Sequence, residues 1–228
     1  MQTPVFVLSD LELGMNQWMT EPFKYPDTPM DRGKVLWEED LEKLQGNWGR
    51  YRDVDDDGIP YRTIPGNKHP RSAYFLRGTG HNEDARYTED SATWARMMDR
   101  IKKKYKNAAK FVPIPIIDKQ DGASIGIIAF GSTEPAIREA RHQLETEAGI
   151  KSDSMRIRGI PFVDEVHKFI ESHEQNFVIE MNRDGQMYQL LLVEYPHLAG
   201  KLTSAAFNDG LPATAKWVKE SILMKEAN

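Results

Sequence analysis

The chain has no cysteine among its 228 residues. That absence excludes disulfides, cysteine-ligated zinc and any iron–sulfur cluster held by thiolates of this chain. It is also typical of a reducing compartment. No apolar run approaches the roughly 18 residues that suggest a membrane-spanning helix, and the N-terminus lacks a signal segment. The sequence therefore predicts a cytoplasmic protein that does not span a membrane.

An excess of one charge is also missing. Lysine and arginine together number 30 against 35 aspartates and glutamates, for a net charge of −5. Because the two signs are well mixed along the chain, nothing indicates a nucleic-acid groove. An apolar content of 39% and a charged content of 29% are typical of a folded globular protein, and the length suits one large domain or two small ones.

Residues 123–228 alternate apolar runs with helical periodicity. The run at 125–130 has the pattern of a strand buried on both faces. Thr133 is placed to cap the helix that follows, Pro135 suits its first turn, and Gly149 suits its end. Further strands are expected at 155–159, 177–181 and 202–207, and further helices at 163–170, 186–194 and 212–224. The pattern predicts an α/β fold, a Rossmann-like parallel sheet covered on both faces.

Residues 1–122 read differently. Residues 3–10 (TPVFVLSD) predict a buried strand. Its neighbours come from later in the chain or, as we favour, from another polypeptide or a missing N-terminal portion, and a turn follows over 10–16. Residues 17–88 interleave prolines and glycines with aromatic residues, which indicates an ordered arm that packs on another surface, with one short acidic helix at 36–44. A capped amphipathic helix is expected at 90–106. Alternate prolines keep 111–117 extended, and a polar turn at 118–122 marks the main boundary.

Two loops match parts of known ligand sites. Asp53, Asp55 and Asp57 have the spacing of the first half of a calcium loop, but its twelfth position is Ile64 where a glutamate is required. A solvated acidic turn is favoured there. Residues 131–133 (GST) follow a strand and precede a helix, as phosphate-binding turns do, but they lack the glycine pattern and the lysine of those motifs. An ordinary turn is favoured.

A third loop, residues 78–84 (GTGHNED), combines glycines that allow close backbone approach with His81, which can titrate near neutral pH. A structural role is favoured for it too. His167, His173 and His197 are expected on the surfaces of helices or loops, without ligand-like spacing. By residue chemistry alone, no active site is evident.

Several segments carry a family likeness. Residues 3–16 (TPVFVLSDLELGMN) closely resemble the last strand of the pyrimidine-binding domain in the alpha subunit of 2-oxoacid:ferredoxin oxidoreductases. Residues 57–66 (DGIPYRTIPG), 78–83 (GTGHNE) and 88–90 (TED) are similar to the segments that follow it there. Residues 125–228 resemble the transketolase-C-terminal-type domain that ends the subunit. The likeness covers the whole chain in the same order, and it is strongest to the 2-oxoglutarate enzymes.

The resemblance implies a thiamine-diphosphate and Mg²⁺ enzyme that decarboxylates a 2-oxoacid, forms an acyl-CoA and passes two electrons through an iron–sulfur cluster to ferredoxin. In the family, the diphosphate end of the cofactor and the cluster belong to a separate beta subunit. The family's Tyr-Pro-Ile-Thr-Pro substrate motif, its carboxylate-binding arginine and its cofactor-activating glutamate precede the strand at residue 4, and none occurs here. No catalytic residue is therefore assigned, and no cofactor is expected on this chain alone.

We therefore expect a C-terminal part of such an alpha subunit. Residues 1–16 would be a strand and turn of the pyrimidine-binding domain, 17–122 an arm, and 123–228 the transketolase-C-terminal-like domain. Its partners would be the beta subunit and the rest of the alpha subunit, with Asn16, His81 and Asn82 nearest the catalytic interface. The competing hypothesis is a stand-alone ligand- or calcium-binding α/β module, and a non-catalytic homologue with a structural role is a third.

Overall fold

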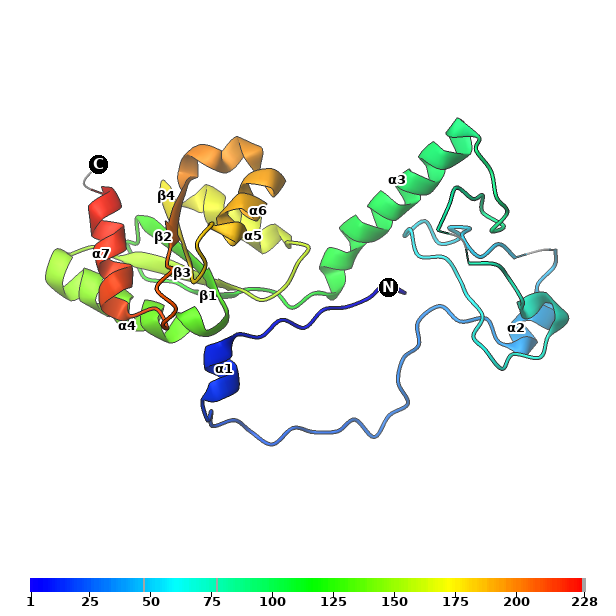
Figure 1. Cartoon of the computed structure of the whole chain (residues 1–228), viewed down its shortest axis with the longest axis horizontal. Coiled ribbons are helices and arrows are strands. Elements are labelled where there is room, and N and C mark those ends of the chain that lie inside the picture. Colours follow the sequence, from blue (N-terminus) through cyan, green and yellow to red (C-terminus); the bar gives the residue numbers. More distant parts are fainter. Residues whose placement is uncertain (47, 77, 227–228) are drawn as a thin grey trace. The chain divides into compact units, whose positions relative to one another are not determined.

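The structure, a computed structural model, describes residues 1–46, 48–76 and 78–226 (Figure 1). The chain divides into two compact units. We call residues 7–20 and 112–228 the sheet unit, and residues 1–6 and 21–111 the arm unit. No helix in the described part of the chain is long and apolar enough to cross a membrane.

The sheet unit contains a five-stranded sheet in the order β1-β3-β2-β4-β5. Strands β2 to β5 are parallel, and β1 pairs antiparallel with β3 at the edge. The strands are β1 (Ile116–Asp118), β2 (Ile125–Phe130), β3 (Ser152–Ile157), β4 (Gln175–Glu180) and β5 (Leu202–Ala206). The helices are α1 (Leu11–Met15), α4 (Glu134–Ala148), α5 (Asp164–Ser172), α6 (Gln186–Glu194) and α7 (Ala215–Glu226), with 3₁₀ turns η3 (Gly131–Thr133) and η4 (Pro196–Lys201). The predicted α/β class with a parallel sheet is confirmed.

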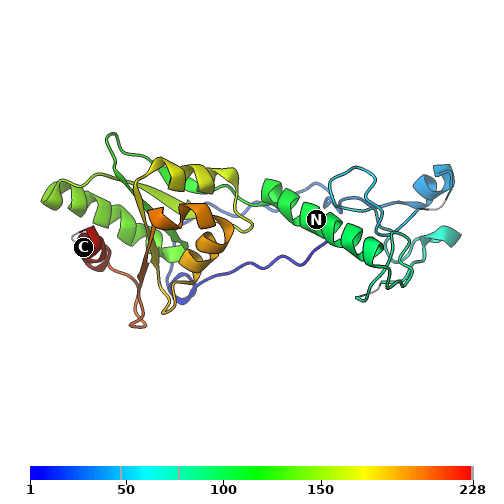
Figure 2. The same cartoon turned by 90° about the horizontal axis from the view of Figure 1, so that it is seen from above.

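Two apolar clusters fill the two faces of this sheet because successive strand residues point to opposite sides. On β2, Ile127 packs with α4 and α7, whereas its neighbour Ile128 packs with α5 and α6. The same alternation separates Phe177 from Val178 on β4. Figures 1 and 2 show α4 and α7 on one face and α5 and α6 on the other. This is the doubly covered arrangement that parallel sheets require.

The edge strand β1 was not predicted, and the sheet therefore begins before residue 123. Pro113 and Pro115 precede β1 and argue against a central strand. An edge strand needs hydrogen bonds on only one side, and β1 pairs with β3 alone. Thr133 also differs from expectation. It occupies the N-cap position of α4 without a side-chain capping bond, because η3 already turns the chain there. Gly149 ends α4 with a φ of 69°, as predicted.

Residues 3–10, predicted to be a buried strand, form no strand within the described part of this chain. The favoured pairing with another polypeptide or a missing N-terminal portion stays a prediction. This segment has no strand pairing in the described structure, and its apolar side chains are exposed, Val7 by 92%. A strand is stable only where a neighbour supplies backbone partners, and no described segment does so here. The turn expected at 10–16 is instead the short helix α1, which Asp10 caps by accepting a hydrogen bond from the Leu13 amide at 2.8 Å.

The arm unit contains α2 (Glu38–Lys43), α3 (Ser91–Ala108) and the 3₁₀ turns η1 (Pro70–Ser72) and η2 (Ala109–Phe111). Both predicted helices are confirmed, and Asp90 caps α3 through the Thr93 amide. The predicted apolar stripe of α3 is only partly buried. Met97 lies inside, but four members of the stripe stay exposed: Trp94, Met98, Ile101 and Tyr105. The loops between the helices are fixed mainly by hydrogen bonds from polar side chains to the backbone.

Candidate functional site

The three-aspartate loop is closed by a lysine of the same unit. The Lys34 ammonium lies 2.6 Å from an Asp55 oxygen and 2.8 Å from an Asp57 oxygen. Asp53 accepts hydrogen bonds from the amides of Asp57 and Gly58, which turns the loop. The Lys34 hydrogen bond, the largest effect, lowers the pKa of Asp55. Within residues 1–46, 48–76 and 78–226, no three His, Asp or Glu side chains are grouped to hold a metal ion.

The turn after β2 is occupied by a carboxylate from α1. In open parallel sheets, ligands bind beyond the carboxyl ends of the strands where the strand order reverses, and here that point lies between β2 and β4. Asp10 accepts a hydrogen bond from the Ser132 amide at 3.1 Å there. Burial raises the pKa of Asp10, but hydrogen bonds from Leu13 and Ser132 outweigh it, so the pKa lies below its ordinary value. The chain's own carboxylate thus fills the position where a phosphate would sit.

On the β4 side of the point where the strand order reverses, a second carboxylate of the chain occupies the amides of the following helix. Glu180, the last residue of β4, is completely buried. Its carboxylate accepts hydrogen bonds from the amides of Met187 and Tyr188 and from the Asn182 side chain, at 2.7 to 3.0 Å. A carboxylate at a helix N-terminus is stabilised by unpaired amides and by the helix dipole. Glu180 therefore anchors α6 to the sheet and is not available to a ligand.

The loop at 78–84 is a turn that its own side chains stabilise, and it contains the titratable side chain of His81. Asn82 accepts hydrogen bonds from the amides of Asp84 and Arg86, so its side chain holds the loop. The Nδ1 of His81 lies 2.9 Å from the Thr79 carbonyl, and its ring stacks on Tyr51 with the centroids 3.9 Å apart. The Nε2 of His81 is buried and has no hydrogen-bond partner among the residues that the structure describes.

Tyr51 is the centre of a group of cations. The Arg50 guanidinium lies 5.2 Å and the Arg100 guanidinium 5.7 Å from the centroid of its ring. Both distances allow a cation–π interaction. Lys104 lies one turn beyond Arg100 on α3, and its ammonium donates to the Gln2 carbonyl at 3.2 Å. We call Arg50, Arg100 and Lys104 the cation cluster.

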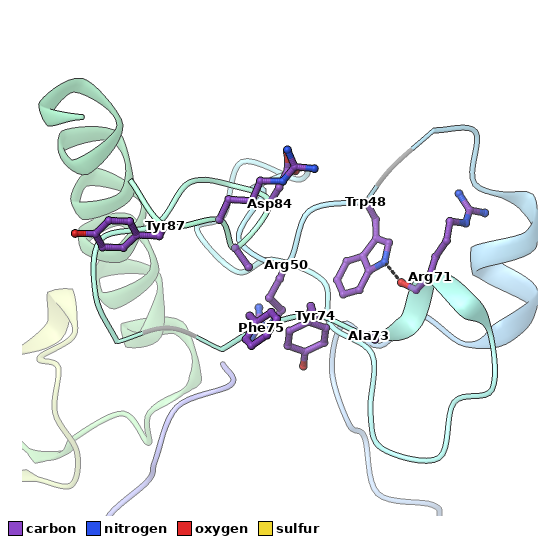
Figure 3. A pocket seen from close by; sticks show the side chains of 10 residues that line it. Trp48, Arg50, Arg71, Ala73, Tyr74, Phe75, Asp84 and Tyr87 are labelled. Carbon is purple, nitrogen blue, oxygen red and sulfur yellow. Dashed lines mark hydrogen bonds between the residues drawn. The ribbon is translucent and has the colours of Figure 1, made fainter. Parts of the chain in front are cut away.

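A cavity of about 460 Å³ adjoins this cluster within the arm unit. Its walls carry aromatic and cationic side chains, among them Trp48, Arg50, Tyr74, Arg86 and Tyr87. Trp48 meets Tyr74 edge to face at 5.5 Å and donates its indole N–H to the Arg71 carbonyl at 2.7 Å, drawn as a dashed line in Figure 3. Such walls suit a flat, anionic small molecule. A cavity in the sheet unit is much smaller than this cavity of the arm unit, at about 40 Å³.

The histidines differ from expectation. His173 is buried, not on a surface: its Nε2 lies 3.2 Å from an Asp153 oxygen and its Nδ1 2.8 Å from the Phe169 carbonyl. His167 and His197 lie near the surface, as expected, but they meet through their Nε2 atoms at 3.2 Å. Thirty residues separate these two in sequence, and no local spacing could have paired them.

The three residues predicted nearest a catalytic interface fall in different units. Asn16 belongs to the sheet unit, where its side chain donates to the Glu12 carbonyl and ends α1. His81 and Asn82 belong to the arm unit. Sequence reasoning missed the cation cluster, because Arg50 and Arg100 lie fifty residues apart. The only local signal was the run Arg50-Tyr51-Arg52, in which an aromatic ring stands between cations.

Comparisons with known proteins were made for the sequence and the structure. No protein-family model matches the sequence. Subunit alpha of 2-oxoacid:ferredoxin oxidoreductase 2 from Aeropyrum pernix is 29% identical over 197 residues, which cover 83% of this chain and 29% of that protein. A solved 2-oxoglutarate:ferredoxin oxidoreductase from Magnetococcus marinus, with 2-oxoglutarate, coenzyme A and succinyl-CoA bound, matches with a TM-score of 0.68 and 25% identity over 80% of this chain and 31% of that chain.

These findings confirm the resemblance read from the sequence. The likeness appears both in sequence and in fold, and both comparisons point to 2-oxoacid:ferredoxin oxidoreductases. The chain spans less than a third of the length of either relative.

Proposed function

We propose that this chain is a C-terminal part of the alpha subunit of a 2-oxoacid:ferredoxin oxidoreductase, most closely of the 2-oxoglutarate type. The complete enzyme would decarboxylate the 2-oxoacid with thiamine diphosphate, form an acyl-CoA and reduce ferredoxin. The chain's own work would be structural. It would pack against the rest of the alpha subunit and the beta subunit, with Asn16, His81 and Asn82 nearest the catalytic interface.

The observation that carries the proposal is the exposed apolar segment over residues 5–30. Twelve large apolar side chains of this segment lie at the surface: Val5, Phe6, Val7, Leu8, Leu11, Leu13, Met15, Trp18, Met19, Phe23, Tyr25 and Met30. So many exposed apolar side chains along one segment indicate an interaction site, because leaving them in water is unfavourable. A subunit that buries the segment against catalytic domains accounts for it.

The side chains that could act as metal ligands in this chain support a structural role. The chain has no cysteine for an iron–sulfur cluster. Asp55 and Asp57, the nearest approach to a Mg²⁺ site, are engaged by Lys34. The residues present therefore do not fit either group, and we derive no catalytic step through them. Both groups would belong to the beta subunit.

The test is the reduction of a viologen dye with 2-oxoglutarate, CoA and thiamine diphosphate present. We expect no reduction by the chain alone and reduction when it is mixed with the upstream part of the alpha subunit and the beta subunit. Replacing Phe6 and Leu8 by aspartate would abolish both assembly and activity. Val54→Asp, at an exposed apolar residue outside the segment, would change neither.

A finer prediction concerns the catalytic interface. His81→Ala in the complete enzyme would lower turnover or substrate affinity, whereas His142→Ala, on the exposed face of α4, would alter neither. Unchanged kinetics in His81→Ala and Asn16→Ala would place the interface elsewhere. Activity of the chain alone would contradict the structural role. A folded mixture without activity would favour the stand-alone ligand-binding module.

A further inference from the structure

The cation cluster has no anion to balance it. None of Arg50, Arg100 and Lys104 forms an ion pair with a carboxylate in the described part of the chain. Burial and then the charge of Arg50 lower the pKa of Arg100, and burial and then Arg100 and Arg50 lower that of Lys104. Like charges held together away from water are unfavourable unless an opposite charge joins them.

The hydrogen bonds of the cation cluster also indicate that an anionic partner is missing. The oxygens that the three cations contact are all neutral: Arg50 donates to the Gln2 side chain at 2.9 Å, Arg100 to the Gly58 carbonyl at 3.0 Å, and Lys104 to the Gln2 carbonyl. The Nε and Nη1 of Arg50 and the Nε of Arg100 are buried, and no atom of the described residues is their hydrogen-bond partner. Buried donors in native proteins almost always have an acceptor, so these three lack the acceptor that their burial normally requires.

The adjoining cavity indicates what the rest of the ligand looks like. Arg50 belongs both to the cluster and to the cavity wall. Trp48 and Tyr74 offer ring faces and edges for a flat group. Asp84 also lines the cavity, but Arg52 pairs with it at 2.9 Å and offsets its charge. The cavity therefore accepts a flat organic group attached to an anion that Arg50 holds.

We propose that the arm unit binds a small aromatic phosphate ester, of the size of a nucleoside monophosphate. The phosphate would accept hydrogen bonds from Arg50 and Arg100 beside Lys104, and the ring would lie in the cavity against Trp48 and Tyr74. A phosphate fits better than a carboxylate because its two negative charges balance more of the three positive ones. Guanidinium forks also match phosphate oxygens in geometry. The site does not depend on the oxidoreductase role, and it is testable on this chain by itself.

The test is calorimetric titration of the full chain, in low salt, with AMP, inorganic phosphate and adenosine as separate probes. We expect AMP to bind at least ten-fold more tightly than either of its parts. Arg50→Gln and Arg100→Gln would each weaken AMP at least ten-fold. Arg96→Gln is the matched control, since Arg96 lies one turn before Arg100 on α3 but pairs with Glu83; it would leave binding unchanged.

Two further variants separate the parts of the site. Tyr74→Leu would weaken AMP but not inorganic phosphate. Arg100→Lys keeps the charge but loses the Nε donor, so it would still weaken AMP, and it replaces Arg100→Gln if circular dichroism shows that variant unfolded. The proposal is overturned if wild-type protein binds none of the probes at millimolar concentration, if AMP binds no better than phosphate, or if Arg96→Gln weakens binding as much as Arg100→Gln.

Discussion

The sheet unit and the arm unit hold their shapes by different interactions. In the sheet unit, two buried apolar clusters cover both faces of five strands. In the arm unit, polar side chains hold the loops. The Arg71 guanidinium, for example, donates to the carbonyls of Leu41, Leu44 and Gly46 at the end of α2.

Because of this difference, the two units bury different amounts of their apolar surface within the chain. Apolar burial needs only contact, and the sheet unit has its own buried core. Hydrogen bonds fix a backbone path but bury little apolar area. The arm unit is therefore ordered locally while the stripe of α3 stays exposed. A unit of this kind is suited to packing on another surface, in line with the proposed role as part of a larger subunit.

The largest predicted effect tests the core of the sheet unit. Phe177 in β4 is fully buried, so Phe177→Ala would leave a cavity and lower the free energy of unfolding by about 3–5 kcal/mol. Phe23→Ala is the matched control, because Phe23 is 94% exposed. It would change the free energy by less than about 0.5 kcal/mol. Urea denaturation of both variants measures this, and a similar loss in both would refute the contrast between core and exposed segment.

The next prediction concerns the backbone of the arm unit. Gly58 has a φ of 80°, and a β-carbon there would lie 2.7 Å from the Arg100 carbonyl and also strike the Lys104 amide. Gly58→Ala should therefore destabilise the arm unit by more than about 2 kcal/mol. Gly66 has a φ of 97° but open space around it, so Gly66→Ala should cost only about 1 kcal/mol.

Limited proteolysis followed by mass spectrometry measures where the chain opens. We expect Gly58→Ala to expose cleavage sites between residues 21 and 111 while the sheet unit stays intact. If cleavage appeared equally in both units, the two would unfold together and the comparison between them would fail. If Gly66→Ala matched Gly58→Ala, the cost would come from the backbone angle and not from the close contact with α3.

Most of the sheet unit could be predicted, and much of the arm unit could not. The strand at 125–130 and the helix ended by Gly149 follow from local apolar patterns, which report burial directly. The apolar pattern at residues 3–10 also predicts burial, but it does not identify the surface against which these residues are buried. The segment has no strand partner within the described part of this chain, and the favoured pairing with another polypeptide stays a prediction.

The candidate site lay beyond sequence reasoning for a related reason. Lys34 contacts Asp55 and Asp57, more than twenty residues further along the chain, and Arg50 and Arg100, fifty residues apart, lie over the same Tyr51 ring. Such contacts have no period, so no local rule reveals them. The burial of His173 against Asp153 was missed in the same way.

A smaller effect is expected where α1 meets the sheet. Asp10→Ala removes the cap of α1 and the acceptor of the Ser132 amide, at a cost of about 1 kcal/mol. Asp10→Asn keeps the cap and should cost less. Because the pKa of Asp10 is lowered in the fold, its contribution is present above its ordinary value of 3.8 and is lost as the pH falls through the folded value.

The measurement is the urea midpoint of wild type and Asp10→Ala between pH 7 and pH 3. The difference between them should be constant down to about pH 4 and then narrow. Asp121→Asn, in an exposed surface turn, should track the wild type throughout. A difference that persisted unchanged to pH 3 would mean that the charge of Asp10 contributes nothing, and that only the shape of the side chain matters.

The smallest predicted effect is on Ca²⁺ binding, and it tests whether the three-aspartate loop of the arm unit is a calcium-binding loop. Lys34 is the cation that the three-aspartate loop already holds, so Ca²⁺ must displace it before the carboxylates can bind. Lys34→Ala removes that competitor, but the loop still lacks the bidentate glutamate needed to complete the six to eight oxygen ligands of Ca²⁺, since position twelve is Ile64. We expect no Ca²⁺ binding by the wild type at millimolar concentration and only weak binding by Lys34→Ala, with a dissociation constant no tighter than about 1 mM. Wild-type binding in the micromolar range would overturn this account, because it would show that the loop recruits ligands from elsewhere and that the arm unit is a calcium module after all.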